Sequence, residues 1–248
     1  MVKQRQQTWV TYALIAANIA AFAYEFAAGA NQGSPTPQQM IDFGGDFAPL
    51  TLDGEWWRIV TSMFLHYGIL HIAMNMICLY QGRIVEIVYG RAGFAALYLA
   101  AGLVGGIASL AHAAHAVSAG ASGAVFGVFG AFGAFLLLRR DRLDPVAVKR
   151  TATSLAMFIG INMVIGLSTP GIDVSDHIGG LIAGFLAGLG LLAGAKTEKL
   201  RWLRAVAVAA VAVGVTAVAL KTLPKPESVV RQHQQDRLND IINGDQQP

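Results

Sequence analysis

Seven long, nearly uncharged apolar segments constrain this chain more than any other feature of its sequence. They cover about residues 9–28, 62–82, 93–111, 121–138, 152–168, 177–195 and 203–222. The hydrocarbon core of a bilayer, ~30 Å thick, is crossed by roughly 20 apolar residues of α-helix. None of the segments shows the alternating pattern of a membrane strand. The sequence therefore predicts an all-α membrane protein, a polytopic helical bundle.

The overall composition agrees with this fold class. The chain of 248 residues is 54% hydrophobic and only 13% charged, whereas soluble domains carry about 25% charged residues. These values exclude a soluble enzyme, a disordered protein and a disulfide scaffold. The net charge of +3 gives no reason to expect a nucleic-acid partner. Cys78 is the single cysteine, which excludes an internal disulfide and a cysteine-based metal cluster. We expect no cofactor and no metal.

The basic residues orient the predicted bundle. Thirteen of the 18 Lys and Arg residues precede the first segment or follow the second, fourth or sixth. The opposite loops hold only Arg58, together with several acidic residues. We therefore expect a multi-pass protein of the cell (inner) membrane with a cytoplasmic N-terminus. The basic C-terminal tail then falls on the outer side if the seventh segment spans the membrane, contrary to the charge rule.

Three regions are expected along the chain. Residues 1–8 form a cytoplasmic N-terminal tail, residues 9–222 a transmembrane domain with an outer loop at 30–60, and residues 223–248 a polar tail. The first segment also resembles a secretory signal peptide, with Ala28, Gly29 and Ala30 at a cleavage position. The length of the apolar region and the charge of Glu25 favour a retained anchor.

Ser122 is the first candidate for chemistry, in the run Gly120–Ala121–Ser122–Gly123 that opens the fourth segment. The glycines let other backbone approach the hydroxyl group. A helix start also offers unpaired backbone N–H groups, where an oxyanion would bind. The alternative interpretation is an ordinary serine N-cap followed by small packing residues.

His177 opens the sixth segment, on the same predicted outer side as Ser122. Histidine titrates in the range that suits a general base for serine. Both segments carry glycines at four-residue spacing, which lets helices pack backbone to backbone and would bring His177 to Ser122. These glycines are Gly123 and Gly127 in one segment, and Gly180, Gly184 and Gly188 in the other. A capping histidine at the water interface is the alternative.

Asp176 is adjacent to His177. Adjacent residues of a helix point about 100° apart. We therefore expect Asp176 to cap the helix rather than to serve as the third member of a catalytic triad.

His71 and Asn75 lie four residues apart and so share one helix face. Both can donate hydrogen bonds to a developing negative oxygen. A structural polar pair between helices is the alternative. Asn162 has no polar neighbour in sequence, and we interpret it as a helix-packing hydrogen bond. A serine, two histidines and an asparagine on the outer half of one bundle favour a catalytic site.

These motifs together resemble the rhomboid family of intramembrane serine proteases, over roughly residues 45–190. The matching motifs are, in order, Gly54–Glu55–Trp56–Trp57–Arg58, Phe64–Leu65–His66 with His71 and Asn75, Gly82 with Glu86 and Gly90, Gly120–Ala121–Ser122–Gly123, and His177 with Gly179, Gly180 and Gly184.

The resemblance implies a six-helix core plus a seventh C-terminal transmembrane helix, and a Ser–His dyad without an acidic partner. Ser122 would be the nucleophile and His177 the general base. His71, Asn75 and the Ser122 N–H would stabilise the oxyanion. Phe126 falls where the family places an aromatic ring, often tyrosine, under the histidine, and Gly120, Gly123 and Gly180 would support the site. The substrates would be transmembrane segments of other membrane proteins, cut near the outer face of the lipid bilayer.

Other functions fit the sequence less well. A non-catalytic membrane protein that binds transmembrane helices is the runner-up, but such a relative would lack the serine or the histidine. No mid-span carboxylate and no paired helix breaks support a transporter. The chain has neither the His-Glu-x-x-His of zinc proteases nor the Gly-x-Gly-Asp of aspartyl intramembrane proteases. His112 and His115 are interpreted as solvated loop residues. Glycine-rich faces serve internal packing and self-association equally, so they assign no oligomeric state.

Overall fold

The computed structural model describes residues 8–31, 33–112, 116–169, 171–192 and 197–227. Its elements are, in order, α1 (Trp9–Ala27), α2 (Pro37–Asp42), β1 (Asp46–Phe47), α3 (Ala48–Thr51), α4 (Arg58–Thr61), the 3₁₀-helix η1 (Ser62–Phe64), α5 (Ile69–Gln81), α6 (Arg83–His112), β2 (Val117–Ser118), α7 (Ser122–Arg139), the 3₁₀-helix η2 (Arg140–Arg142), α8 (Pro145–Ser168), α9 (Val174–Leu192) and α10 (Glu198–Thr222). The predictions for residues 1–7 and 228–248 of the two tails, and for His115, lie outside these described residues.

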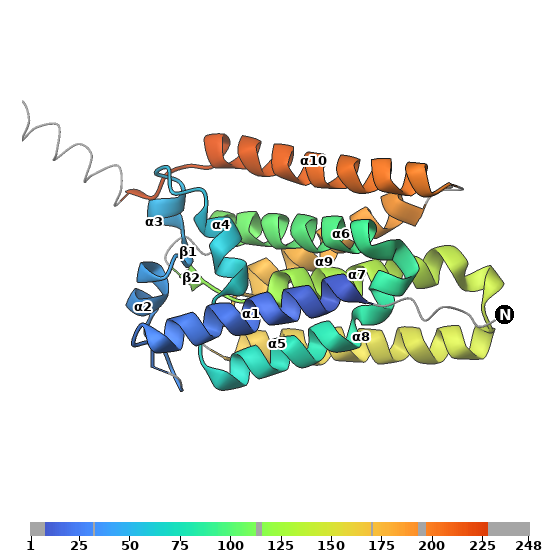
Figure 1. Cartoon of the computed structure of the whole chain (residues 1–248), viewed down its shortest axis with the longest axis horizontal. Helices are drawn as coiled ribbons and strands as arrows, with labels where there is room; N and C mark the ends of the chain where they lie inside the picture. Colours follow the sequence, from blue (N-terminus) through green and yellow to red (C-terminus); the bar gives the residue numbers. More distant parts are fainter. Residues whose placement is uncertain (1–7, 32, 113–115, 170, 193–196, 228–248) are drawn as a thin grey trace, which may run out of the picture.

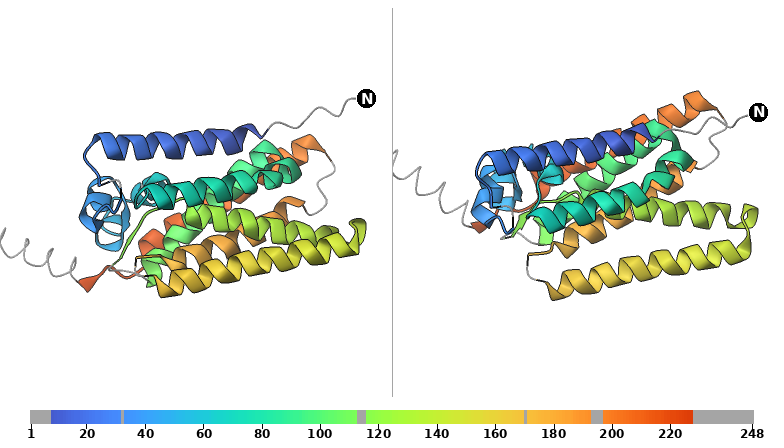
Figure 2. Two further views of the ribbon diagram at one scale, coloured as in Figure 1. Left: turned by 90° about the horizontal axis from the view of Figure 1, so that it is seen from below. Right: turned by 60° about the horizontal axis from the view of Figure 1, so that its bottom comes forward.

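The long helices run roughly alongside one another as one bundle (Figure 1). Six helices in the described part of the chain are long and apolar enough to cross a membrane. The predicted all-α polytopic fold is confirmed. α6, α7 and α9 form the centre, and α10 packs on α6. Figure 2 shows α1 along one edge of the bundle and α8 along the opposite edge.

The second apolar segment, predicted as one span over residues 62–82, is broken. The stretches Arg58–Phe64 and Ile69–Gln81 meet at a bend of 90°. Leu65 has an extended backbone, and Gly68 has φ 93°, a conformation that favours glycine. The prediction of a continuous span was wrong because the length of an apolar segment gives no information about a bend within it.

α7 and α9 pack backbone to backbone. A Cβ added to Gly180 would clash with the Gly123 carbonyl, and one added to Gly184 would clash with the backbone of Gly127. The glycine series identified in the sequence therefore meet each other. α6 joins them, because Gly105 approaches Gly179 closely. These contacts bring the starts of α7 and α9 together.

Glu86 fastens the first turns of α6 to the start of α1. Its carboxylate accepts hydrogen bonds from the backbone N–H groups of Val10 (3.0 Å) and Thr11 (2.8 Å) and from the Thr11 hydroxyl (2.7 Å). The first N–H groups of a helix have no partner within that helix. Glu86 supplies the acceptors they need, which gives this buried carboxylate a structural role.

The expected outer loop at 30–60 is folded rather than open. The short strands β1 and β2 pair antiparallel. Arg58 ties the segment together, because its guanidinium group donates to the carbonyl oxygens of Ile41 (2.6 Å) and Gly45 (3.2 Å). The same group pairs with Glu55 at 2.7 Å. This folded segment covers the end of the bundle where α7 and α9 start (Figure 1).

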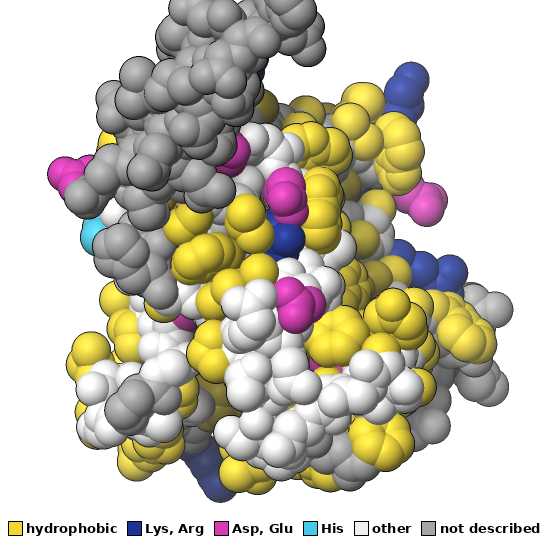
Figure 3. Space-filling model, turned by 90° about the vertical axis from the view of Figure 1, so that its left-hand side faces the viewer, with side chains coloured by type: hydrophobic (Ala, Val, Ile, Leu, Met, Phe, Trp, Pro, Cys, Tyr) yellow, Lys and Arg dark blue, Asp and Glu magenta, His cyan; other side chains and the backbone are white. Residues whose placement is uncertain are grey.

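α10 extends to that same end. Lys225, just after α10, forms an ion pair with Asp53 at 2.8 Å. Figure 3 views this end of the bundle directly, and hydrophobic side chains (yellow) together with backbone and other uncharged atoms (white) make up most of the surface that is not grey.

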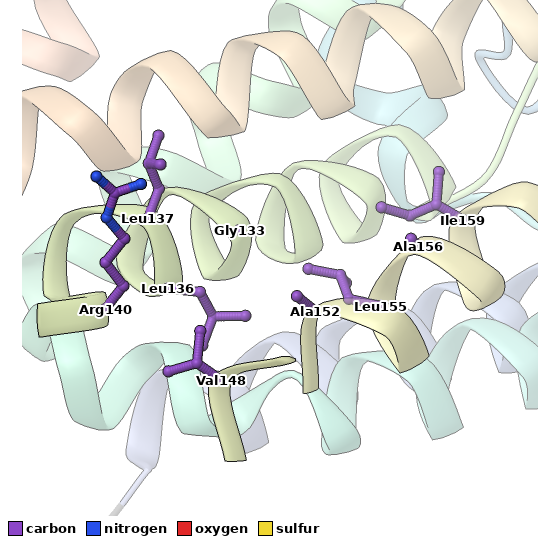
Figure 4. A pocket seen from close by; sticks show the side chains of 9 residues that line it. All are labelled: Gly133, Leu136, Leu137, Arg140, Val148, Ala152, Leu155, Ala156 and Ile159. Atoms are coloured by element: carbon purple, nitrogen blue, oxygen red, sulfur yellow. The ribbon is translucent and has the colours of Figure 1, made fainter. Parts of the chain in front are cut away.

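α8 is loosely attached to the bundle. Only 6% of its most apolar stretch is buried. An apolar hollow, lined in part by Leu136, Val148 and Leu155, lies between α8 and the end of α7 (Figure 4). This hollow is at the opposite end of α7 from Ser122, so it brings together no candidate for chemistry.

Replacing Gly184 by alanine tests the contact between α7 and α9. Gly184→Ala is expected to lower the free energy of unfolding by about 1–3 kcal/mol, because the new methyl group meets the Gly127 backbone. Gly190→Ala, on the same helix, is the control, since a Cβ there has nothing within 4 Å. Reversible unfolding in mixed micelles with rising SDS measures both. Equal stability of the two variants would contradict the close approach.

Candidate active site

Ser122 is the first residue of α7 but is not its N-cap. Ala121 occupies the cap position and makes no side-chain capping bond, so the N-cap interpretation of Ser122 is wrong. Gly120 has φ 145° and donates its N–H to the carbonyl of Ser62 at 2.8 Å. A Cβ on Gly120 would lie 3.1 Å from His71 Nε2 and 3.4 Å from Ser122 Oγ. His71 and Ser122 therefore border the same small space.

His177 lies in the first turns of α9, where only 8% of it is exposed. Its ring stacks on Phe126, with centroids 4.4 Å apart and planes inclined by 13°. Phe126 is about one turn after Ser122 on α7, so the stack holds the imidazole against the helix that carries the serine. His177 Nδ1 is buried and has no hydrogen-bond partner among the described residues. The aromatic stack thus orients this ring, whereas no carboxylate in the described structure does.

The hydrogen bonding of His71 determines which of its nitrogens can donate. His71 Nδ1 accepts a hydrogen bond from the Tyr67 backbone N–H at 3.2 Å. A neutral His71 ring therefore carries its proton on Nε2, the atom that faces Gly120 and Ser122. The fully buried His66 contacts the His71 ring edge-on, with centroids 5.2 Å apart.

Both asparagines of interest bond within their own helices. Asn75 donates one amide N–H to the His71 carbonyl at 3.1 Å, which leaves a second amide N–H as a further donor. Asn162 donates to the Phe158 carbonyl at 2.8 Å. The interpretation of Asn162 as a hydrogen bond between helices is therefore wrong, because its partner is four residues earlier on α8.

Asp176 does not cap α9, contrary to the sequence interpretation. Asp173 stands just before α9, and its Oδ1 accepts the Asp176 backbone N–H at 3.0 Å. The Asp176 carboxyl group points inward instead, where it lies against Gly105 and Gly123 and interacts with the Gly123 N–H and the Ser122 side chain. The spacing of Asp173 and Asp176, which places them at the N-cap and N3 positions, is a signal that sequence reasoning missed. Since Asp173 can cap the helix alone, the Asp176 side chain is free to point elsewhere.

The structure thus gathers Ser122, His177 and His71 at one end of the bundle, with Asn75 one turn farther along α5. The three supporting glycines identified in the sequence give them room. Gly120 borders the space between His71 and Ser122, and Gly180 meets Gly123. Within the described residues, no group of three or more His, Cys, Asp or Glu side chains is arranged to hold a metal ion.

Sequence reasoning missed Asp46, a buried carboxyl group beside the site. Its Oδ1 accepts the Thr51 hydroxyl at 2.6 Å, whereas its Oδ2 has no hydrogen-bond partner in the described part of the chain. Burial raises the pKa of Asp46 from 3.8 to about 7, and the nearby Asp173 carboxylate adds to this rise. Asp46 lies in β1, far in sequence from Asp173, so only the fold brings the two together.

Comparison with known proteins gives consistent matches. A family model described as "Rhomboid domain" matches residues 53–194. The chain is 37% identical to "Rhomboid protease GluP" of Bacillus subtilis over 98% of its own length and 48% of the relative's. It is also 37% identical to "RHOMBOID-like protein 7" of Arabidopsis thaliana, over 55% of this chain and 43% of the relative. "Rhomboid protease AarA" of Providencia stuartii is 33% identical over 38% of this chain and 34% of the relative. The chain thus spans about half the length, or less, of these relatives.

Asp46 predicts a pH dependence of stability. Between pH 3.8 and about 7 the folded chain keeps the Asp46 proton that the unfolded chain releases. Protonated Asp46 therefore contributes stability that is fully present below this window and is lost as the pH rises through it. The free energy of unfolding should fall by at most about 1.4 kcal/mol per pH unit from this group. Asp46→Asn should remove this slope, and Asp42→Asn, an exposed carboxyl group of the same region, should keep it. The test is to measure the free energy of unfolding of the wild type and both variants from pH 4 to 8. Equal slopes for wild type and Asp46→Asn would contradict the buried, protonated carboxyl group.

Proposed function

Because the chain belongs to the rhomboid family, we propose that it is an intramembrane serine endopeptidase that cuts transmembrane segments of other membrane proteins. The observation that carries this proposal is the meeting of Ser122, His177 and His71 at one end of a membrane helix bundle. Direct backbone contact between α7 and α9 produces that meeting. The small space beside Gly120 suits a substrate residue with a small side chain next to the cut.

In the proposed reaction, Ser122 attacks and His177 moves the proton. The Ser122 Oγ forms a bond to the carbonyl carbon of the scissile peptide while His177 takes the hydroxyl proton. His177 then gives this proton to the leaving amine as the C–N bond breaks. Water enters and, again through His177, releases the acyl group from Ser122. The stack on Phe126 supports this role, because it holds the imidazole without a third catalytic group.

His71 and Asn75 are proposed to stabilise the oxyanion of the tetrahedral intermediate. The Tyr67 N–H keeps His71 Nδ1 as an acceptor, so Nε2–H is the donor on the side of Ser122. The second amide N–H of Asn75 and the Ser122 backbone N–H would complete the set. Donors of this kind act because they are already in position when negative charge develops on the substrate oxygen.

The distribution of charge supports a location near the outer face of the cell (inner) membrane. α5, α7 and α9 end, and α6, α8 and α10 begin, at the end of the bundle where α1 begins (Figure 1). Eleven of the 18 basic residues lie in the turns between these helices or in the helical segments beside the turns, which supports a cytoplasmic location for that end. Ser122 begins α7, and His177 lies near the start of α9, at the other end. A substrate helix would therefore be cut near its outer end, where water can enter.

The two proposed dyad residues are tested by alanine substitution. In liposomes that contain a single-span substrate, Ser122→Ala and His177→Ala should each lower the cleavage rate by at least about a thousandfold. Ser168→Ala and His112→Ala are matched controls at exposed positions and should retain wild-type rates. Cleavage should persist in EDTA. Activity that survives in Ser122→Ala would refute the dyad, and chelator inhibition reversed by zinc would indicate a metal mechanism. Binding of transmembrane helices without cleavage would support a non-catalytic relative.

The proposed oxyanion donors have a different kinetic signature. His71→Ala and Asn75→Ala are each expected to lower kcat by about 10²–10³-fold, because a removed donor is missed chiefly in the transition state. KM should change little. Steady-state kinetics at several substrate densities in the membrane separate the two constants. A rise in KM at unchanged kcat would assign these residues to substrate binding instead.

A further inference from the structure

Asp176 has no part in the mechanism above, although its carboxyl group contacts the nucleophile. It lies in the first turn of α9 and is 8% exposed. Its carboxyl group lies against Gly123 at the start of α7, where it interacts with the Gly123 backbone N–H and with the Ser122 side chain. A buried carboxyl group is costly unless its partners compensate for the water it has lost. Here both partners belong to the start of α7.

Two glycines on neighbouring helices form the slot that holds this carboxyl group. A Cβ added to Gly105 on α6, or to Gly123 on α7, would clash with the Asp176 side chain. The space is therefore open only because both positions lack a side chain. Three helices contribute to the slot, which makes the placement of Asp176 a property of the fold.

Two other roles that an aspartate at this position could have are excluded by its surroundings. Capping of α9 belongs to Asp173, whose Oδ1 accepts the Asp176 N–H. Asp176 does not orient the neighbouring histidine through its Nδ1 either, because His177 Nδ1 has no hydrogen-bond partner among the described residues. The contact that remains is the one to Ser122.

We propose that Asp176 is a positioning residue for Ser122, an inference that rests on the proposed protease function. Its carboxyl group restricts the rotation of the Ser122 side chain and stabilises the first turn of α7. A serine side chain otherwise samples three staggered rotamers. Restricting it in advance lowers the entropy that must be lost when the hydroxyl oxygen meets a substrate carbonyl. His177, the next residue of the same turn, then takes the proton.

Substitutions that separate size from hydrogen bonding test this role. Asp176→Leu fills the slot without polar atoms and should lower kcat about 10- to 100-fold, with KM nearly unchanged. Asp176→Asn keeps an acceptor for Gly123 and a polar group for Ser122, so its kcat should stay within about threefold of wild type. Asp176→Ala replaces the leucine variant if thermal melting shows that the latter unfolds. Asp42→Leu removes an exposed carboxyl group and should retain wild-type kcat.

A second measurement needs no transmembrane substrate. A fluorophosphonate labels an activated serine: the Ser122 Oγ–P bond forms, the P–F bond breaks, fluoride leaves, and His177 takes the hydroxyl proton. The rate constant for labelling, followed by intact-protein mass spectrometry, should fall in Asp176→Leu by the same factor as kcat. It should be nearly unchanged in Asp176→Asn.

These measurements keep the two proposals apart. Wild-type labelling without substrate cleavage would refute the protease function, and the labelling rates of the variants would still decide the role of Asp176. Wild-type labelling rates in Asp176→Leu would overturn the inference. So would an Asp176→Asn variant that is as slow as Asp176→Leu, since charge alone would then matter. A variant faster than wild type would also overturn it, because Asp176 would restrain the serine. A wild-type chain that neither cleaves nor becomes labelled would overturn both proposals.

Discussion

The backbone contact between α7 and α9 determines where the chemical groups of this protein can lie. Because glycines face one another there, the two helices start side by side at one end of the bundle (Figure 1). Residues next to the contact then face across it: His177 lies on Phe126, and Asp176 reaches Ser122. Larger side chains at these glycines would separate the serine from the histidine while leaving both residues unchanged. The glycines are therefore as necessary to the site as the polar residues.

Much of this arrangement could be predicted because it follows from local sequence patterns. The length of the apolar segments predicts the helices, and the four-residue spacing of Gly180 and Gly184 predicts a close helix contact. Ser122 and His177 stand out because strongly polar groups are rare inside apolar segments. The inward direction of Asp176 depends instead on empty space at Gly105 and Gly123, two positions on other helices. No pattern within one segment contains that information.

The bend after η1 shows a second limit of the apolar pattern. Both arms of the bend are apolar, so one continuous span over 62–82 was the natural prediction. The bend, however, is what places the Tyr67 N–H against His71 Nδ1 at 3.2 Å. A straight helix would use that N–H for its own backbone ladder. The break thus determines which nitrogen of His71 faces Ser122, and it does so through a backbone group that has no sequence signature.

The helix starts at the site explain why carboxyl groups accompany it. α7 and α9 both begin there, and the first N–H groups of each helix lack partners within the helix and carry partial positive charge. Buried donors need acceptors. Asp173 accepts an N–H of α9, and the Asp176 carboxyl group lies against Gly123 of α7 and interacts with its N–H. The Ser122 N–H is the donor that we propose for the oxyanion. The same property that makes a helix start favourable for a developing negative charge therefore requires nearby acceptors in the resting protein. At this site one of those acceptors also interacts with the side chain of the proposed nucleophile, and our proposal for Asp176 therefore links the stability of the α7 start to the orientation of Ser122.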